Sequence, residues 1–423
     1  METHIADRFK TLASAADMES VLRSCVHCGF CLATCPTYQL LGDERDSPRG
    51  RIYLIKSLVE GKADGKETRF HLDRCLTCRS CETTCPSGVQ YAQLLGDARE
   101  LMEQALPRPF PDKVVRFGLK RLLSHPRRFG WVMGLARAMR PLLPAGLRDK
   151  IPASVAAGVL PAPRHARRVL FLAGCVQPVL RPSIQAAAMR LLDGLGISGV
   201  VAPAAGCCGA LNHHLGDGAA ALVQMKANID AWWPYVEAGS VEAIIATASA
   251  CGVELRDYGH ALRHEEGYAE RARRLSELVR DVGEFLCDEL GHGIDERRLA
   301  LQSLGLDLTR ERGKVAFHAP CTLQHGLRRQ GRVEDILRAT GVELVPVDEA
   351  HLCCGSAGTY SLLQPDLSTQ LRARKLSHLQ SSGPAYILSA NIGCQMHLAE
   401  AAEVPVRHWV EWLDAQIHGG TSC

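Results

Sequence analysis

Eight cysteines in two matching runs carry the clearest chemistry in this sequence. Each run follows the spacing C-x2-C-x2-C-x3-C-P, which is a ligand pattern for [4Fe–4S] clusters. Three thiolates at this spacing can reach three irons of one cube, and in two-cluster proteins the fourth cysteine ligates the other cube. We therefore predict two cofactor-binding sets: Cys25, Cys28, Cys31 and Cys85 for one cluster, and Cys75, Cys78, Cys81 and Cys35 for the other.

Zinc is the alternative occupant of four-thiolate sites. Zinc sites usually combine one CxxC pair with a second, distant pair. Two identical four-cysteine runs, each followed by a proline, do not fit that arrangement. The spacing favours iron–sulfur clusters.

Eight further cysteines form a second, repeated pattern. Cys175 to Cys207 and Cys321 to Cys353 are both steps of 32 residues, and each second cysteine begins a Cys-Cys-Gly triplet. Three interpretations stay open: a metal or iron–sulfur site in each repeat, a redox-active dithiol, or a buried group of reduced cysteines. We predict metal binding in at least one repeat, with these candidate ligands: Cys175, Cys207, Cys208, Cys251, Cys321, Cys353, Cys354 and Cys394. We expect the nearby histidines to be structural: His213, His214, His318, His325, His351 and His397.

Composition bounds the class of protein. The chain has 423 residues, of which 46% are apolar, so it can bury ordinary globular cores in two to four domains. Its 18 cysteines are clustered and its first residues lack an apolar signal segment, which favours the reducing cytoplasm and metal ligation over disulfides. The sequence has no run of 18 apolar residues, so no membrane-spanning helix is predicted.

The elements that would position the cysteine runs are helical. Residues 1–105 read as a helical ferredoxin domain, with an amphipathic helix at 51–60 between the runs and no clear strand. Arg45, Arg49 and Arg51 near this helix could stabilise anionic clusters or face solvent, and for each of them the solvent-facing position is the one we expect.

Residues 106–168 read as a basic connector. From Pro107 to Arg168 it has 14 lysines and arginines against two acids, with aromatic residues between them and helices expected at 114–123 and 129–143. Such a segment can lie at an anionic lipid surface, dock on an acidic partner, or simply wrap the neighbouring domains. Nucleic acid is not expected, since no recognition motif accompanies the charge.

The rest of the chain alternates strand and helix patterns. Strands expected at 169–173, 200–201 and 243–247 are followed by a second series at 314–318, 342–347 and 385–389, which indicates two copies of an α/β unit with a parallel sheet. We place the copies at 169–310 and 311–418. The predicted fold class is α+β multidomain, a helical two-cluster ferredoxin domain followed by two such units. In each, the cysteines follow strand ends, where parallel sheets place ligands.

The chain resembles the iron–sulfur subunits of bacterial glycolate dehydrogenase (glycolate oxidase), which combine two ferredoxin runs with two CCG cysteine-rich domains. The resemblance covers nearly the whole chain and includes the segments 25–31, 48–56, 228–234, 321–325 and 351–360. In one respect this chain departs from the wider family, which often ends each set with CxxC. Here Cys251 and Cys394 are followed by Glu254 and His397 at that spacing, which argues against a non-cubane cluster of the heterodisulfide-reductase kind.

The resemblance implies an electron-transfer subunit of an oxidoreductase complex. A partner flavoprotein carrying FAD would oxidise glycolate to glyoxylate, and this chain would pass the electrons toward a membrane quinone. A cytoplasmic location, with peripheral contact to the inner face of the membrane, is expected. The alternatives are the corresponding subunit of a lactate or glycerol-3-phosphate dehydrogenase, or an enzyme that uses its CCG sites as heterodisulfide reductases do. No catalytic residue is predicted in this chain, because no G-x-G-x-x-G flavin or nicotinamide fingerprint follows a strand.

Overall fold

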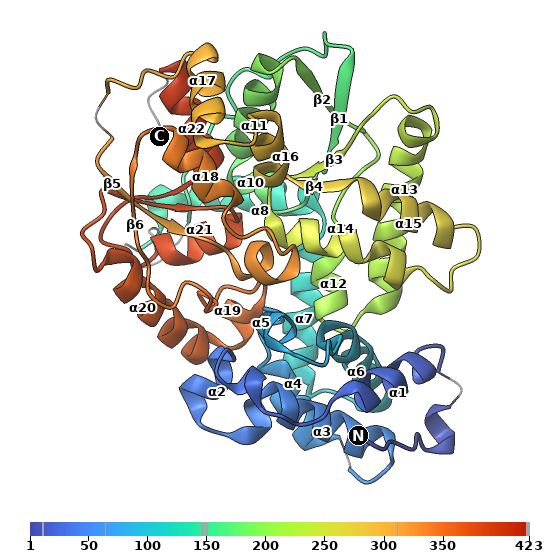
Figure 1. The fold of residues 1–423 in the computed structure, drawn as a ribbon. Coiled ribbons are helices and arrows are strands. Elements are labelled where there is room, and N and C mark those ends of the chain that lie inside the picture. The colour runs from blue at the N-terminus through green and yellow to red at the C-terminus, as the bar shows by residue number, and fades with distance from the viewer. Residues whose placement is uncertain (11, 64, 145–147, 149–150, 311, 420–423) are drawn as a thin grey trace.

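The protein is built from a helical N-terminal unit, a pair of connector helices and two α/β units (Figure 1). The structure is a computed structural model. It describes residues 1–423 apart from 11, 64, 145–147, 149–150, 311 and 420–423. The helical unit lies beneath both α/β units, and the connector helices run up behind them. The predicted α+β class is confirmed.

The N-terminal unit has helices but no strand among its described residues. It comprises η1 (Asp7–Phe9), α1 (Ala15–Ser24), η2 (Phe30–Leu32), α2 (Pro36–Leu41), η3 (Glu44–Asp46), α3 (Pro48–Val59), α4 (Lys66–Asp73), α5 (Ser80–Thr84) and α6 (Tyr91–Ala105). Helix α3 begins sharply because Pro48 occupies its first turn and the Ser47 Oγ accepts a hydrogen bond from the Gly50 backbone N–H at 3.0 Å. Its buried residues pack with Leu22 and Leu94 in one core under the cysteine runs.

The connector forms α7 (Phe110–Leu123), α8 (Pro126–Met139) and η4 (Arg140–Leu142). Several of its basic residues are paired within the chain, which reduces the free charge that the composition suggested. Arg108 and Arg116 both bind Asp73, and Lys120 binds Asp217 at 2.6 Å. Residues 145–147 and 149–150 of the predicted connector lie outside the described residues.

Each α/β unit contains four parallel strands. The first contains β1 (Arg167–Phe171), α10 (Gln177–Leu180), α11 (Pro182–Gly194), β2 (Ile197–Val201), α12 (Ala210–His214), α13 (Gly218–Glu237), β3 (Ile244–Ala246), α14 (Ser249–Ala261), α15 (Ala269–Leu278), β4 (Val279–Asp281), α16 (Val282–Glu289) and α17 (Ile294–Ser303). The second contains β5 (Lys314–His318), η5 (Thr322–Gly326), α18 (Arg332–Ala339), β6 (Glu343–Val345), α19 (Tyr360–Leu363), α20 (Pro365–Gln380), β7 (Tyr386–Ser389), α21 (Ile392–Ala399), β8 (Val406–His408) and α22 (Trp409–His418).

The two sheets have the same strand order. It is β2-β1-β3-β4 in the first unit and β6-β5-β7-β8 in the second, so each central pair of strands is flanked by one strand on either side. The register is also matched, with Leu170 opposite Ile244 in one sheet and Ala316 opposite Ile387 in the other. The duplication predicted from the cysteine steps is therefore a duplication of topology.

The two units pack together through equivalent helices. Helix α11 of the first unit packs on α22 of the second, and α16 of the first packs on α18 of the second. A cross-unit ion pair accompanies each contact: Arg190 Nε donates to Asp414 Oδ1 at 3.1 Å, and Arg332 Nη1 donates to Asp288 Oδ1 at 2.9 Å. One hydrophobic core runs through this interface and contains residues from both sheets. The interface therefore holds both cysteine sets in a fixed relation.

Candidate metal centres

The first cavity lies at the N-terminal cysteine run. The thiols that line it are Cys25, Cys28, Cys31 and Cys85, together with Cys81. The cavity opens beside exposed apolar side chains, since Val26 is 66% and Phe30 is 61% exposed and Cys28 is itself exposed. Any cofactor held here would lie close to the protein surface.

The second cavity is built from the other run and lies against the first. The thiols that line it are Cys35, Cys75, Cys78 and Cys81. Pro48, Cys81 and Tyr91 line both cavities, so the two share a wall. The structure thus brings together the four thiols of each predicted set, and their role as ligands stays a prediction.

The backbone curls in the same way in both runs. His27 and Thr77, which precede the second cysteine of each run, have φ values of 56° and 54°. The residues after that cysteine are also left-handed, with φ of 87° at Gly29 and 60° at Arg79. Left-handed backbone at non-glycine residues costs about 1 kcal/mol or more each and persists where the surroundings require it. These left-handed residues let the backbone of each run curl around its cavity.

The chemistry of the lining fits a thiolate-bound metal cluster. All described cysteines are free thiols rather than disulfides. Burial raises the pKa of Cys31 to about 11 and raises the pKa of Cys78 and Cys81 well above the ordinary value. Several buried thiols therefore stay protonated until a bound cation displaces their protons. Four thiols around each of two adjoining cavities fit two [4Fe–4S] cubes.

The second cavity touches the second α/β unit. Cys78 packs in an apolar cluster with Cys321 and Cys353 of that unit. A side-chain hydrogen bond between Thr83 and His325 at 2.9 Å crosses the same boundary. Helix α5 accordingly lies directly under the second unit in Figure 1.

The first-repeat cysteines meet at the carboxyl ends of the parallel strands. Their thiols form a hydrogen-bonded chain that runs Cys175, Cys207, Cys208, Cys251. Hydrogen bonds from Cys175 and Cys208 lower the pKa of Cys207 below its ordinary value. Two neutral side chains bond to the backbone of the Cys-Cys pair: Asn228 Nδ2 donates to the Cys207 carbonyl at 2.8 Å, and the Tyr258 hydroxyl donates to the Cys208 carbonyl at 2.7 Å.

The second-repeat cysteines meet in the same way. The Sγ atoms of Cys321 and Cys353 lie 3.8 Å apart, and the chain continues through Cys354 to Cys394. His318 joins them: one of its ring nitrogens and the Sγ atoms of Cys354 and Cys394 all lie within 4.8 Å of one another. Burial lowers the pKa of His318 to about 3, so its imidazole is neutral, as a metal ligand must be. His318 Nδ1 also lies 3.0 Å from Ser389 Oγ, a contact of the kind expected for a structural histidine.

A buried lysine distinguishes the second repeat from the first. Lys375 is 2% exposed, and its Nζ donates to the Glu349 carbonyl at 2.7 Å. Burial lowers its pKa, and the charges of Cys354, Cys353 and Cys321 oppose that effect. The sequence did not single out Lys375, because a lysine within a helical pattern normally faces solvent.

The glycine of each Cys-Cys-Gly triplet has a structural reason. Gly209 and Gly355 have φ values of 98° and 91°, in the left-handed region. A Cβ atom on Gly355 would lie 2.6 Å from the Ser368 carbonyl oxygen of α20, and one on Gly209 would lie 3.3 Å from the Ala221 carbonyl oxygen of α13. Glycine lets the chain turn tightly there, so that both cysteines approach the neighbouring helix.

One arginine of the N-terminal unit contradicts its prediction. Arg51 was expected to face solvent, but it is 1% exposed and lines the second cavity. Arg45 and Arg49 are partly exposed and form ion pairs with Asp43 and Glu44. Residue spacing could have suggested burial, since Arg51 lies three residues after Pro48 and four before Ile55, which are both on the buried face of α3.

Comparison with known proteins agrees with this architecture. A 4Fe-4S dicluster domain model matches residues 21–89, and a cysteine-rich domain model matches residues 169–256 and 315–399. The chain is 49% identical over 415 residues to the glycolate oxidase iron-sulfur subunit of Escherichia coli (strain K12), covering 98% of both proteins. The chain belongs to this family of iron–sulfur subunits.

Other members and relatives are more distant. The chain is 30% identical to the probable glycolate oxidase iron-sulfur subunit of Bacillus subtilis (strain 168), covering 90% of this chain and 89% of the relative. Lactate utilization protein A of Geobacillus thermodenitrificans is 27% identical over 239 residues, which are 55% of this chain. The family resemblance stated from the sequence is confirmed. Among the described residues, no helix has the length and apolarity needed to cross a bilayer.

Proposed function

We propose that this chain is the electron-transfer subunit of a flavin-dependent glycolate-oxidising complex, a subunit of an oxidoreductase rather than the site of glycolate chemistry. FAD and the conversion of glycolate to glyoxylate lie on a partner flavoprotein in this proposal. The observation that carries it is the pair of adjoining, cysteine-lined cavities. Two one-electron centres in contact suit a flavin, which receives electrons in pairs from its substrate.

The ligand sets follow the cavities. Cys25, Cys28, Cys31 and Cys85 would hold one [4Fe–4S] cluster, and Cys35, Cys75, Cys78 and Cys81 would hold the other. The first cavity opens at the surface, which suits exchange with a docked partner. The second lies against the second α/β unit, which suits onward transfer within the chain.

A quinone is the proposed acceptor, and the connector supports contact with an anionic lipid surface where quinones reside. Helices α7 and α8 expose large apolar side chains, including Phe117 at 60%, Trp131 at 83% and Leu135 at 64%. Basic residues lie among them, and Arg127 makes no ion pair with any described residue. Apolar side chains entering the headgroup region, with arginines at its surface, are typical of interfacial helices. Binding would be peripheral, on the cytoplasmic side.

Anaerobic purification of the tagged full-length chain tests this function. We expect a flavoprotein to co-purify, and about eight iron atoms per chain from two four-iron clusters, plus any metal in the α/β units. Cys28→Ser and Cys78→Ser should each remove one cluster and abolish transfer to quinone, while the flavoprotein still reduces artificial dyes. Cys287→Ala is the matched control, because Cys287 is buried in the core away from both cavities. Zinc in place of iron would overturn the proposal.

A second candidate function concerns the second repeat. We infer that His318, Cys354 and Cys394 bind a metal ion or cluster, since their ligand atoms converge and the imidazole is neutral. The first-repeat cysteines are weaker candidates, because no histidine joins them within reach among the described residues. If this site is itself catalytic, the chain would reduce its acceptor without the flavoprotein. If the chain is only an electron relay, it would not. Quinone reduction by the isolated chain with a thiol reductant distinguishes the two.

A further inference from the structure

Arg51 places a buried positive charge at the wall of the second cavity. Its side chain is 1% exposed and lines the cavity beside Cys35 and Cys75. A guanidinium stays protonated in proteins, so Arg51 keeps its positive charge although its side chain is buried. A full guanidinium charge therefore faces the thiols.

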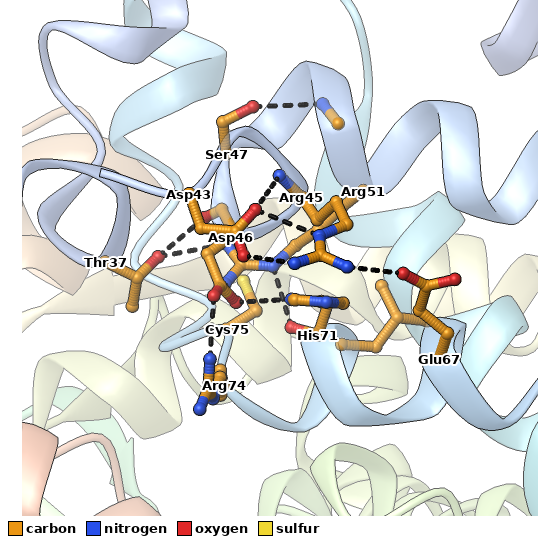
Figure 2. Close-up of polar contacts among 12 residues, drawn as sticks. Thr37, Asp43, Arg45, Asp46, Ser47, Arg51, Glu67, His71, Arg74 and Cys75 are labelled. Carbon is orange, nitrogen blue, oxygen red and sulfur yellow. Dashed lines mark hydrogen bonds and ion pairs between the residues drawn. The ribbon is translucent and has the colours of Figure 1, made fainter. Parts of the chain in front are cut away.

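Hydrogen bonds fix the guanidinium in place (Figure 2). Arg51 Nε donates to the His71 carbonyl at 2.8 Å, and Nη1 donates to Thr37 Oγ1 at 3.1 Å. Thr37 Oγ1 in turn lies 3.3 Å from Cys35 Sγ. The charge is thus held against the cavity and linked to one of its thiols through a single hydroxyl.

The nearby carboxylate does not cancel the positive charge. Asp46 is fully buried, and its Oδ1 accepts a hydrogen bond from Arg51 Nη2 at 3.2 Å. The same carboxylate also accepts a bond from Arg74 Nη1 at 2.9 Å and contacts His71 Nδ1 at 3.0 Å. One carboxylate therefore serves two guanidinium groups, as Figure 2 shows, and cannot offset both of their charges; the neighbouring Asp43 is paired with Arg45.

Among the described residues that line the first cavity, no side-chain cation is buried as Arg51 is, although the N-terminal ammonium of Met1 donates to the Cys25 carbonyl at 3.0 Å. Arg49 lines this cavity, but its side chain is 32% exposed and pairs with Glu44 at 2.6 Å. A carboxylate and water therefore offset the charge of Arg49. The two cavities differ in their electrostatics although their cysteine patterns are the same.

We propose that the Arg51 guanidinium raises the reduction potential of the iron–sulfur cluster in the second cavity. This inference rests on the proposed binding of a cluster by Cys35, Cys75, Cys78 and Cys81. A four-thiolate cube is anionic and gains one more negative charge when it is reduced, so a fixed neighbouring cation stabilises the reduced state. Net charge and hydrogen bonding are known determinants of cluster potential. Arg51 would thereby draw electrons to the centre that adjoins the second α/β unit.

The test is a potentiometric titration of the anaerobically purified full-length chain, followed by electron paramagnetic resonance. The signal of the second cluster is the one that Cys78→Ser removes. Arg51→Gln should lower its equilibrium constant for reduction about tenfold or more, which is about 59 mV for a one-electron couple. The first cluster should keep its potential. Arg51→Lys should restore most of the loss, and the matched control Arg49→Gln should leave the second cluster unchanged.

Asp46→Asn supplies the decisive comparison. Removing the carboxylate increases the net positive charge, so the potential of the second cluster should rise, opposite to the effect of Arg51→Gln. A purely structural role would move both variants in the same direction, and that result, or unchanged potentials, would overturn the inference. If Arg51→Gln loses its second cluster, Asp46→Asn decides alone, and no rise overturns the inference. Wild-type protein without iron would instead refute the proposed function on which the inference rests.

Discussion

Arg79 combines an unfavourable backbone with a favourable ion pair. It follows the second cysteine of its run and has a φ of 60°, whereas the equivalent residue of the other run is Gly29 at 87°. Its guanidinium binds both carboxylate oxygens of Asp257 in α14, with Nη1 to Oδ1 at 3.4 Å. This pair ties the second cavity to the first α/β unit. Substitution should therefore have two separable effects.

The magnitudes follow from the geometry. Unit charges about 3.5 Å apart at an effective dielectric constant of about 20 attract by about 5 kcal/mol, and desolvation offsets much of this. Because the side chains are only 16% and 27% exposed, we expect Arg79→Ala to lower the free energy of unfolding by about 2 kcal/mol. Arg79→Gly should recover about 1 kcal/mol of that loss, because glycine adopts left-handed backbone without strain.

Thermal unfolding of the anaerobic protein, followed by cluster absorbance and circular dichroism, measures both effects. At about 2 to 4 °C per kcal/mol for a unit of 150–250 residues, Arg79→Ala should melt several degrees below the wild type and Arg79→Gly between them. A double-mutant cycle with Asp257→Ala should give a coupling of about 1 kcal/mol. Arg273→Ala is the control, since its ion pairs are exposed. A glycine variant less stable than the alanine variant would refute the backbone argument, and additive effects would refute the ion pair.

Three further predictions concern the α/β units and the connector. Cys353→Ser with Cys354→Ser should lower metal content and melting temperature together while the resonance signals of both cubes persist; unchanged values would return these cysteines to a structural role. Burial raises the pKa of Asp281 to about 7. The carboxyl of Asp281 keeps its proton up to about pH 7 in the folded protein but loses it near pH 4 in the unfolded chain. The free energy of unfolding should therefore fall as pH rises from about 4 to 7, by up to about 1.4 kcal/mol per pH unit. Asp281→Asn should flatten that slope in denaturant titrations, and an unaltered slope would exclude this group. Trp131→Ser with Leu135→Ser should weaken sedimentation with anionic vesicles at least about tenfold, since each buried apolar side chain contributes about 2 kcal/mol; Leu299→Ser, also exposed, should not.

Local spacing predicted much of this architecture and missed what depends on tertiary packing. The two α/β copies were visible because their cysteine steps and strand runs recur in order. Strands β4 and β8 were not predicted. Each has three residues, includes a charged or polar side chain and leads directly into a helix, so neither shows an apolar run. The helical pattern that hid β4 belongs to α15 and α16 on either side.

The polar residues that distinguish the sites were the hardest to predict. His318 lies at the end of β5 and meets Cys394 only because β5 and β7 are neighbours in the sheet. Arg51 and Lys375 are long cations in amphipathic helices, and sequence favours an exposed position for both. Their burial depends on partners distant in the chain, Asp46 and the Glu349 carbonyl among them. Such partners leave no periodic signal, although the spacing of α3 does place Arg51 on the buried face of that helix.

The two buried cations have a common electrostatic explanation. Cys78 packs against Cys321 and Cys353, so an anionic cluster in the second cavity would face the thiolates of the second repeat. Two anionic centres in contact oppose each other's charge, and each added electron increases that repulsion. Arg51 lies on one side of this contact and Lys375 on the other. In the first repeat, none of the described ferredoxin cysteines packs with the thiols, and the neutral Asn228 and Tyr258 donate to the carbonyls of its Cys-Cys pair. Buried cations therefore accompany the repeat that packs against Cys78, and we expect this repeat to be the one that exchanges electrons with a cluster in the second cavity.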